Sequence, residues 1–334
     1  MLSPVAVRAW CRVDFGGGTL DIWPLGLLHP GARTVNVAVD LAVTVELLRS
    51  STHRYVVRQG SSVTEAASAD ELARHSETSL IGVIAAALAL PPFEVSLASE
   101  SPRGGGLGAS SAMTVAFLTA AEVAFDRPHS RPERIAALAR DLEARLMALP
   151  TGLQDHYPAL LGGALEILAE PGGERVRSLD VDLQRLGESL LVVYSGQSHF
   201  SAGNNWQVVR RRLDGEAGVT GLFAGIAETT AELAPALEAG DFPRVGELMS
   251  REWSYRRQLA AGISTPILEN LLQVAAANGA WGGKACGAGG GGSLAILCPP
   301  ERKNDIATAL QREGGETLSA RPVGTPLAIT KTEG

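Results

Sequence analysis

The sequence contains little cysteine, and this scarcity limits the sites it can build. Its 334 residues include three cysteines, which are Cys11, Cys286 and Cys298. Their separations match neither the spacing of metal ligands nor that of a redox pair. We therefore expect no cysteine-based metal or redox site, and free thiols are typical of a reducing compartment.

Basic charge and long apolar segments are also scarce. Lys and Arg total 29 against 36 Asp and Glu, a formal net charge of −7, so no basic face predicts nucleic-acid binding. The longest apolar run, from Leu80 to Leu90, is too short to cross a bilayer. The N-terminus lacks a basic segment followed by an apolar core, as a secretory signal would have. We expect a cytoplasmic monomer or homodimer that binds neither nucleic acid nor membrane.

The chain is nevertheless large and apolar enough for a substantial core. Hydrophobic residues make up 45% of it, which suits one large domain or two fused domains. The apolar period predicts strands over residues 35–47, 55–58, 62–64, 93–97, 164–168, 189–194, 293–298 and 327–330. It predicts helices over residues 72–90, 110–124, 130–148, 204–278 and 301–313, the fourth of them broken near Gly215, Gly240 and Gly262. This mixture indicates an α+β chain with an N-terminal and a C-terminal half.

The most informative segment is rich in glycine. It reads Gly104, Gly105, Gly106, Leu107, Gly108, Ala109, Ser110 and Ser111, and it opens an apolar helical pattern. Glycine permits a positive backbone φ and leaves no Cβ between the amides and a ligand. The free amides and the positive dipole end of the following helix favour an anion. We predict a phosphate-binding loop rather than a plain turn. The serine hydroxyls would cap the helix, donate hydrogen bonds to phosphate, or bind magnesium.

The flanking sequence excludes two common phosphate loops. The Walker loop needs Gly-Lys followed by Ser or Thr, whereas Gly283-Lys284 is followed by Ala285. The dinucleotide loop needs a second strand after its helix, with an acidic residue at the end of that strand. Here a second helix, which starts near Pro132 with capping-box spacing from Ser130, follows instead.

Three segments in this order resemble the motifs of the GHMP small-molecule kinases, which include galactokinase, homoserine kinase and mevalonate kinase. Residues 8–21 resemble the first motif, residues 106–112 the second and residues 283–293 the third. The phrases at residues 15–18 and 35–40 resemble most closely the heptose 7-phosphate kinase branch of sugar kinases. The resemblance implies a two-domain α+β fold. Residues 1–180 would resemble domain 2 of ribosomal protein S5, and residues 181–334 would form a ferredoxin-like half.

The resemblance also implies a catalytic cluster. Asp155 would accept the proton of the attacking hydroxyl, and Arg12 would stabilise the transferred phosphoryl group. Glu143 would bind magnesium together with Ser110, with Ser111 as the alternative hydroxyl. Each residue also has an ordinary structural interpretation. Glu143 could pair with a neighbouring arginine, Arg140 or Arg145, on a solvated helix face, Asp155 could be a turn residue, and Arg12 could lie at the surface of an edge strand.

For the phosphoryl acceptor, the resemblance points to two glycine segments and one carboxylate. Gly17 and Gly18 would bring the backbone close to the substrate, and Asp21 would accept hydrogen bonds from sugar hydroxyls. The third motif would turn beside the phosphate loop and support the active site, with Gly289 and Gly290 contacting the substrate. His199 either lines the acceptor pocket or lies in a surface loop. Leu20 departs from the heptose-kinase pattern, so the motif identifies no particular sugar.

The prediction is an ATP- and Mg²⁺-dependent kinase. It would act on a hydroxyl of a sugar or sugar phosphate, with a heptose 7-phosphate-like acceptor first. One alternative keeps the fold and takes a non-sugar acceptor such as mevalonate or homoserine. Another is a nucleotide-binding sensor without catalysis, which would have no need of the base at Asp155.

Overall fold

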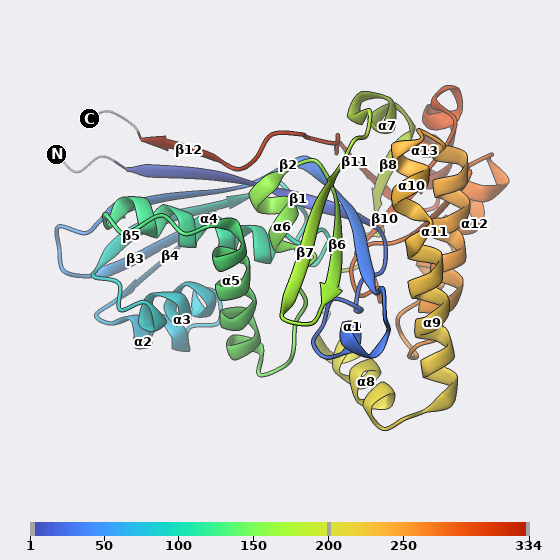
Figure 1. The fold of residues 1–334 in the computed structure, drawn as a ribbon. Coiled ribbons are helices and arrows are strands. Elements are labelled where there is room, and N and C mark those ends of the chain that lie inside the picture. Colours follow the sequence, from blue (N-terminus) through green and yellow to red (C-terminus); the bar gives the residue numbers. More distant parts are fainter. Residues whose placement is uncertain (1–3, 199–201, 332–334) are drawn as a thin grey trace.

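The protein is described from a computed structural model over residues 4–198 and 202–331, so His199 lies outside the described residues. Two long strands, β1 (Val5–Gly16) and β2 (Arg33–Arg49), pair antiparallel at the centre of the molecule. Their branched residues suit a pleated sheet, and most side chains of both strands are buried on both faces. Helices pack on that sheet and on a second, smaller sheet (Figure 1).

The larger sheet has eight strands. Its main path runs β12–β1–β2–β5–β3–β4, and the β6–β7 hairpin joins it through β2. The remaining strands are β3 (Tyr55–Gln59), β4 (Ser62–Ala66), β5 (Phe93–Ser99), β6 (Ala164–Glu170), β7 (Gly173–Leu179) and β12 (Ala328–Lys331). Because β2 is long, its first residues pair with β6 and its last residues with β5.

The helices that follow β4 in the N-terminal half are α2 (Ala69–Arg74), α3 (Ser79–Ala87), α4 (Ala109–Ala124), α5 (Pro132–Met147) and α6 (His156–Leu161). The predicted single helix over residues 72–90 is wrong, because the chain turns between α2 and α3. The Thr78 hydroxyl donates to the Leu72 carbonyl there, at 2.9 Å. The two helices also pack closely, since a Cβ on Gly82 would lie 2.2 Å from the Ala73 backbone nitrogen.

The smaller sheet has four antiparallel strands in the order β11–β8–β10–β9. They are β8 (Leu190–Tyr194), β9 (Gly282–Ala285), β10 (Ser293–Leu297) and β11 (Glu316–Leu318). The accompanying helices are α7 (Leu183–Ser189), α8 (Ala202–Leu213), α9 (Ala217–Ala231), α10 (Leu233–Glu238), α11 (Phe242–Arg256), α12 (Pro266–Ala277) and α13 (Lys303–Arg312), with a 3₁₀ turn at Pro300–Arg302. The predicted helix breaks occur at Gly215, Gly240 and Gly262, each with positive φ, and α9 ends in a further break at Glu232.

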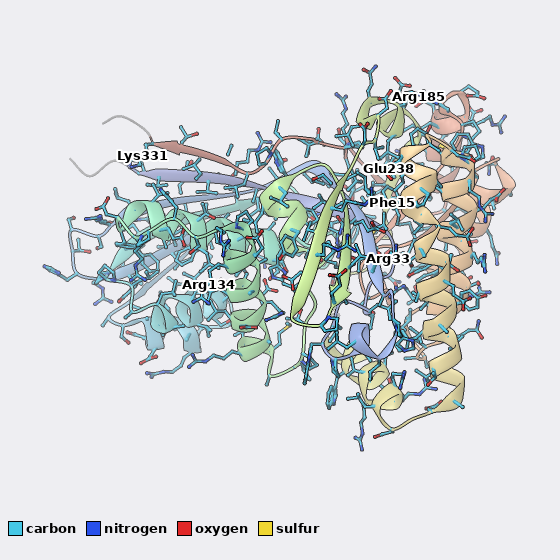
Figure 2. All side chains as sticks on the ribbon, viewed as in Figure 1. Phe15, Arg33, Arg134, Arg185, Glu238 and Lys331 are labelled. Carbon is cyan, nitrogen blue, oxygen red and sulfur yellow. The ribbon has the colours of Figure 1, made fainter. Side chains whose placement is uncertain are left out.

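The larger of the apolar clusters reaches into both halves. The larger apolar cluster runs from the strands of the first sheet to Val192 of β8 and Leu248 of α11. At the surface, Arg177 of β7 pairs with Glu238 of α10 at 2.6 Å, and Figure 2 labels Glu238 near the top of that helix. The last strand, β12, pairs with β1 of the first sheet. The division into two domains at residue 180 stays a proposal, because β12 lies beyond that residue and yet belongs to the first sheet.

A short helix, α1 (Leu25–Leu28), follows the first motif and packs beside β6 (Figure 1). Over the described ranges, none of the helices has the length and apolar character needed to span a membrane.

Candidate active site

The phosphate-binding candidate is the loop between β5 and α4. Gly104, Gly106 and Gly108 have φ of +66°, +71° and +75°, in the left-handed region that favours glycine. Gly108 is the N-cap residue of α4, and no side chain caps the helix amides. The alternative interpretation of the serines as caps of this helix is therefore wrong. The first amides of a 16-residue helix stay free to face an anion.

The third glycine segment packs directly against this loop. The Ser293 backbone nitrogen donates to the Gly105 carbonyl at 2.8 Å. A Cβ on Gly106 would lie 2.7 Å from the Cys286 carbonyl oxygen. The C-terminal half therefore packs against the phosphate loop and supports it through these contacts.

Gly289 and Gly290 face a different neighbour. The Gly290 nitrogen donates to the Ile263 carbonyl at 2.6 Å, and a Cβ on Gly289 would lie 2.3 Å from that oxygen. Their packing thus fixes the turn after α11. Contact of these two glycines with a substrate stays a prediction.

Arg12 and Asp155 meet beside the phosphate loop. Arg12 Nε and Nη2 approach Asp155 Oδ1 at 2.8 Å and 2.6 Å, and Nη1 donates to the Gly106 carbonyl at 2.5 Å. Arg12 is 2% exposed, so the interpretation as a surface residue of an edge strand is wrong. Burial would lower the pKa of Arg12, but Asp155 and Asp14 outweigh it and raise that pKa.

Asp155 stands at the start of α6, after the irregular segment that follows α5. A Cβ on Gly108 would lie 3.2 Å from the Asp155 Cβ, so the aspartate lies against the loop. Its side chain is 26% exposed. Oδ2 has no hydrogen-bond partner among the residues that the structure describes, and it remains free to accept a proton or a hydrogen bond.

Glu143 of α5 is buried against the first turn of α4. It accepts hydrogen bonds from Thr114 Oγ1 at 2.7 Å and Ser111 Oγ at 3.0 Å. Its exposed fraction of 6% contradicts a surface pairing with Arg140 or Arg145. Burial alone would raise the pKa of Glu143, but His156 and the two hydroxyls lower it, so the carboxylate is ionised at neutral pH.

His156 is a buried partner that the sequence reasoning missed. Its Nε2 lies 3.2 Å from Glu143 Oε2, and the side chain is 1% exposed. Burial would lower the pKa of His156, but the Glu143 carboxylate outweighs it and raises that pKa. The sequence offered one signal for His156, which is that it directly follows Asp155. Both residues stand at the start of α6.

The donor set suits magnesium better than a metal that needs a protein cage. Across residues 4–198 and 202–331, no group of three His, Cys, Asp or Glu could hold a metal. Mg²⁺ is commonly bound through one or two carboxylates together with substrate phosphates. Glu143 with a neighbouring serine hydroxyl fits that pattern. Ser111 contacts Glu143, and Ser110 is exposed beside it, so the choice between them stays open.

Asp21 organises the segment that precedes Asp155. Its Oδ2 accepts a hydrogen bond from the Gln154 nitrogen at 2.9 Å, and a Cβ on Gly152 would lie 1.8 Å from the same oxygen. Burial raises the pKa of Asp21. The other oxygen, Oδ1, is buried without a hydrogen-bond partner, which suits a site that takes a hydroxyl donor.

Gly17 and Gly18 allow the first motif to turn tightly. A Cβ on Gly17, which has φ of +84°, would lie 1.9 Å from the Arg33 carbonyl oxygen. The Gly18 carbonyl accepts from Arg256 Nη2 at 2.7 Å, and Glu252 Oε1 accepts from the Gly17 nitrogen at 3.2 Å. Helix α11 of the C-terminal half thus holds this loop. A direct role of these glycines in substrate binding stays a prediction.

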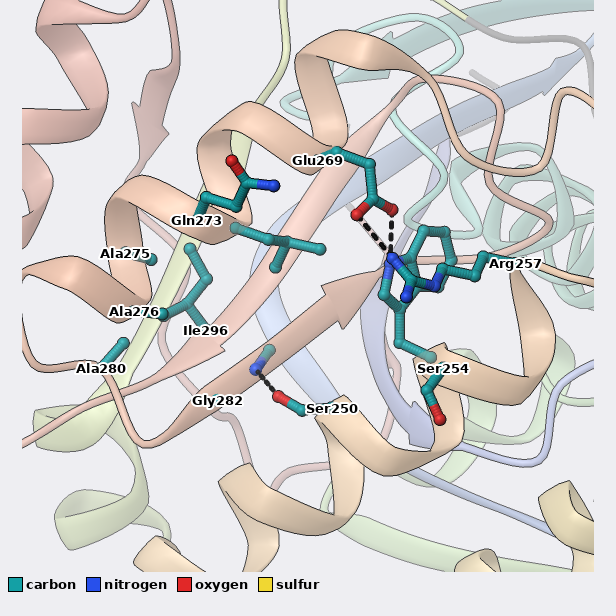
Figure 3. Close-up of a pocket in the computed structure, with 13 residues that line it drawn as sticks. Ser250, Ser254, Arg257, Glu269, Gln273, Ala275, Ala276, Ala280, Gly282 and Ile296 are labelled. Carbon is teal, nitrogen blue, oxygen red and sulfur yellow. Dashed lines mark hydrogen bonds and ion pairs between the residues drawn. The ribbon is translucent and has the colours of Figure 1, made fainter.

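Two hollows lie near these elements. A cavity of about 270 Å³ has Asp21 in its wall, together with Trp23, Arg33 and Glu174. Another of about 230 Å³ lies between α11, α12 and β9 (Figure 3). Its charged pair, Arg257 and Glu269, is joined at 2.8 Å, and its walls include neither the phosphate loop nor the catalytic candidates. Neither the phosphate loop nor Asp155 lines the first cavity either, but Asp21 does, so the first cavity is the better candidate for part of a substrate site.

Known proteins resemble this chain along most of its length. Residues 69–163 match the model of the GHMP kinases N terminal domain, and residues 233–316 match that of GHMP kinases C terminal. D-glycero-alpha-D-manno-heptose 7-phosphate kinase of Campylobacter jejuni is 27% identical over 227 residues, 67% of this chain and 66% of that protein. Mevalonate kinase of Methanothermobacter thermautotrophicus is 31% identical over 222 residues, 66% of this chain and 69% of that protein. The match thus spans about two thirds of each relative.

The fold as a whole recurs in a solved structure. A D-glycero-D-manno-heptose 1-phosphate kinase from Bacteriodes thetaiotaomicron superposes with a TM-score of 0.76 at 19% identity. The superposition covers 99% of this chain and 100% of that one. The two-domain α+β fold class predicted from the sequence is therefore confirmed.

Proposed function

Because the chain belongs to the GHMP kinases, we propose that it transfers the γ-phosphoryl group of ATP to a hydroxyl of a sugar or sugar phosphate. The observation that carries this proposal is the Arg12–Asp155 pair, held against the phosphate loop by the Arg12 bond to Gly106. Phosphoryl transfer needs positioning and charge stabilisation more than covalent chemistry. This cluster supplies a cation, a carboxylate and free helix amides at one place.

Each of these groups would have its own role in the transfer. The amides at the start of α4 would bind the ATP phosphates, and the Arg12 guanidinium would stabilise negative charge on the transferred group. The free Oδ2 of Asp155 would orient the attacking hydroxyl and accept its proton. Arg12 occupies Oδ1, and it thereby fixes the direction of the carboxylate.

Glu143 and a serine hydroxyl, Ser110 or Ser111, would hold Mg²⁺ beside the phosphates. The ion would neutralise part of the phosphate charge. Glu143 is ionised and lies at the first turn of α4, which supports this assignment. The hydroxyls that now donate to it would turn toward the ion or toward phosphate oxygens.

The class of phosphoryl acceptor follows from Asp21 and from the relatives. An unpartnered buried carboxylate oxygen suits a hydroxyl-rich molecule, and the heptose 7-phosphate kinase relative favours a heptose 7-phosphate-like acceptor. A non-sugar acceptor is the second candidate, because a mevalonate kinase matches at 31% identity. Leu20, which lines the cavity beside Asp21, suits an apolar group equally well.

A screen of ADP release tests the proposal. Purified protein with ATP and Mg²⁺ would be offered sugars, sugar 7-phosphates, mevalonate and homoserine, with Asp155→Asn as the control. We expect acceptor-dependent ADP release that the control variant loses. Release with mevalonate or homoserine alone would move the function to the second candidate. ATP binding without release for any acceptor would favour the nucleotide-binding sensor.

A further inference from the structure

A buried pair of opposite charges, Asp14 and Lys284, lies where the three motifs meet. Asp14 and Lys284 are both 0% exposed, and Lys284 Nζ is ion-paired with Asp14 Oδ2. Asp14 belongs to the first motif, and Lys284 belongs to β9, which leads into the third. Burying two charges costs desolvation free energy, which further contacts of the pair can offset.

The Asp14 carboxylate also contacts two parts of the candidate active site. Its Oδ1 accepts a hydrogen bond from the Gly287 backbone nitrogen at 2.8 Å and lies 3.6 Å from Arg12 Nη1. Residues two apart on a strand project to the same face, so Arg12 and Asp14 point together toward the glycine loops. One carboxylate thus joins the third glycine loop to the cation that holds Asp155.

We propose that Asp14, held by Lys284, is a positioning residue for phosphoryl transfer. It fixes the Arg12 guanidinium against the third glycine loop, so that the Arg12–Asp155 pair keeps its place beside the phosphate loop. This inference rests on the proposed function and extends it to two fully buried residues. Burial would raise the pKa of Asp14, but Lys284 and Arg12 lower it to about 2, which keeps the carboxylate charged at any working pH.

The competing explanation is that Asp14 serves only to neutralise Lys284. Two substitutions at Lys284 separate these roles, because both remove the charge while only one keeps a donor. Lys284→Gln retains an amide that can donate to Asp14, whereas Lys284→Met has a similar length and no donor. Under the proposal, the Gln variant keeps kcat within about threefold of wild type, and the Met variant loses about 10- to 100-fold, as small misplacements of catalytic groups do.

The affinity for ATP provides a second readout. The Met variant should keep ATP binding within about threefold in calorimetry, since the phosphate loop itself is intact. Glu238→Gln, which removes a surface pair that also joins the two halves, is the matched control and should leave kcat unchanged. Equal kcat values for Lys284→Gln and Lys284→Met would overturn the proposal.

A double variant tests Asp14 directly. Asp14→Asn alone leaves the buried Lys284 charge with Glu252 Oε2, 4.0 Å away, as its remaining carboxylate partner, and should lower the melting temperature by about 4–7 °C. Adding Lys284→Met removes that charge and should restore most of the stability. If Asp14 positions Arg12, the double variant regains stability while kcat stays low. Recovery of both would mean that Asp14 is only a counter-ion, and the proposal would be wrong.

A spectroscopic readout makes the result independent of turnover. The Nε–H resonance of Arg12 in NMR spectra, assigned by its loss in Arg12→Lys, should shift in Lys284→Met and stay in place in Lys284→Gln. An unshifted resonance in both variants contradicts the positioning role. If wild type phosphorylates none of the acceptors in the screen, the proposed function fails, and this comparison still decides whether Asp14 positions Arg12.

Discussion

At the residue scale, the proposed phosphoryl transfer depends on Asp155, which has one carboxylate oxygen held by Arg12 and the other free. Asp155→Asn should lower kcat by about 100- to 10,000-fold, because the amide cannot accept a proton. ATP affinity should change little, since the loop amides remain. Steady-state kinetics and calorimetry check this, with Asp141→Asn on the exposed face of α5 as the control. Near-normal turnover in Asp155→Asn would make it a structural residue.

The His156–Glu143 pair predicts how stability changes with pH. Its contribution is fully present below the ordinary His pKa of 6.5 and is lost as the pH rises through the raised pKa of folded His156. On the acid side, the contribution is lost as the pH falls through the lowered pKa of Glu143. The pair therefore stabilises most between these limits.

His156→Gln should abolish the alkaline part of this dependence. Denaturant unfolding at a series of pH values from 5.5 to 9 would measure it, as steps of roughly one unit resolve a single titration. His53→Gln, an exposed histidine on a surface bend, is the control. An unchanged pH profile in His156→Gln would show that the histidine is neutral when folded.

At this scale the sequence predicted the residues but not their partners. Arg12, Glu143 and Asp155 were singled out by motif position, and the structure brings Arg12 and Asp155 into contact. His156 and Asp14 were missed because each gains its meaning from a contact more than ten positions away in the chain. Buried charge pairs of this kind leave no local pattern, since both partners are common surface residue types.

At the element scale, the segment from Pro150 to Asp155 depends on one close approach. A Cβ on Gly152 would lie 1.8 Å from Asp21 Oδ2. Gly152→Ala should therefore displace the segment that carries Asp155, lower stability by about 1–3 kcal/mol and reduce kcat.

Gly221→Ala is the matched control for that substitution. Gly221 lies in the middle of α9 with open space around its Cα, so alanine should stabilise the protein by about 0.5–1 kcal/mol and leave kcat unchanged. Thermal unfolding and turnover of both variants would be compared. A Gly152→Ala protein as active as wild type would mean that Asp21 is not needed to place Asp155.

The prediction of helices and strands succeeded for segments with a long, unbroken apolar pattern. It failed where close packing between two elements sets their boundary. The strand over residues 35–47 and the helix over 110–124 have unbroken patterns, and both appear as β2 and α4. The break between α2 and α3 was missed, because Gly82 packs on α2 and only tertiary contact reveals it. Strand β7 was missed as well, since its alternating polar residues bury only one end.

At the scale of the whole molecule, the second and third motifs form one body across the two halves. The third glycine loop supports the phosphate loop, and α11 holds the first motif. A resemblance to known motifs predicted that these segments meet, whereas composition and periodicity alone did not. The packing that joins the halves includes the larger apolar cluster, and a sequence pattern does not record which apolar faces meet.

The larger apolar cluster leads to a prediction about ligand-linked stability. Because one apolar cluster spans both halves, thermal unfolding should be a single transition. ATP with Mg²⁺ at 100 times its Kd should stabilise the whole protein by about 2.7 kcal/mol. Calorimetric scans with and without ATP would measure this, and removal of Mg²⁺ by a chelator should shrink the shift. Glu143→Gln should shrink it similarly, because the amide is a poor ligand for magnesium. Two separate transitions, with only the first raised by ATP, would mean that the phosphate loop gains no support from the C-terminal half.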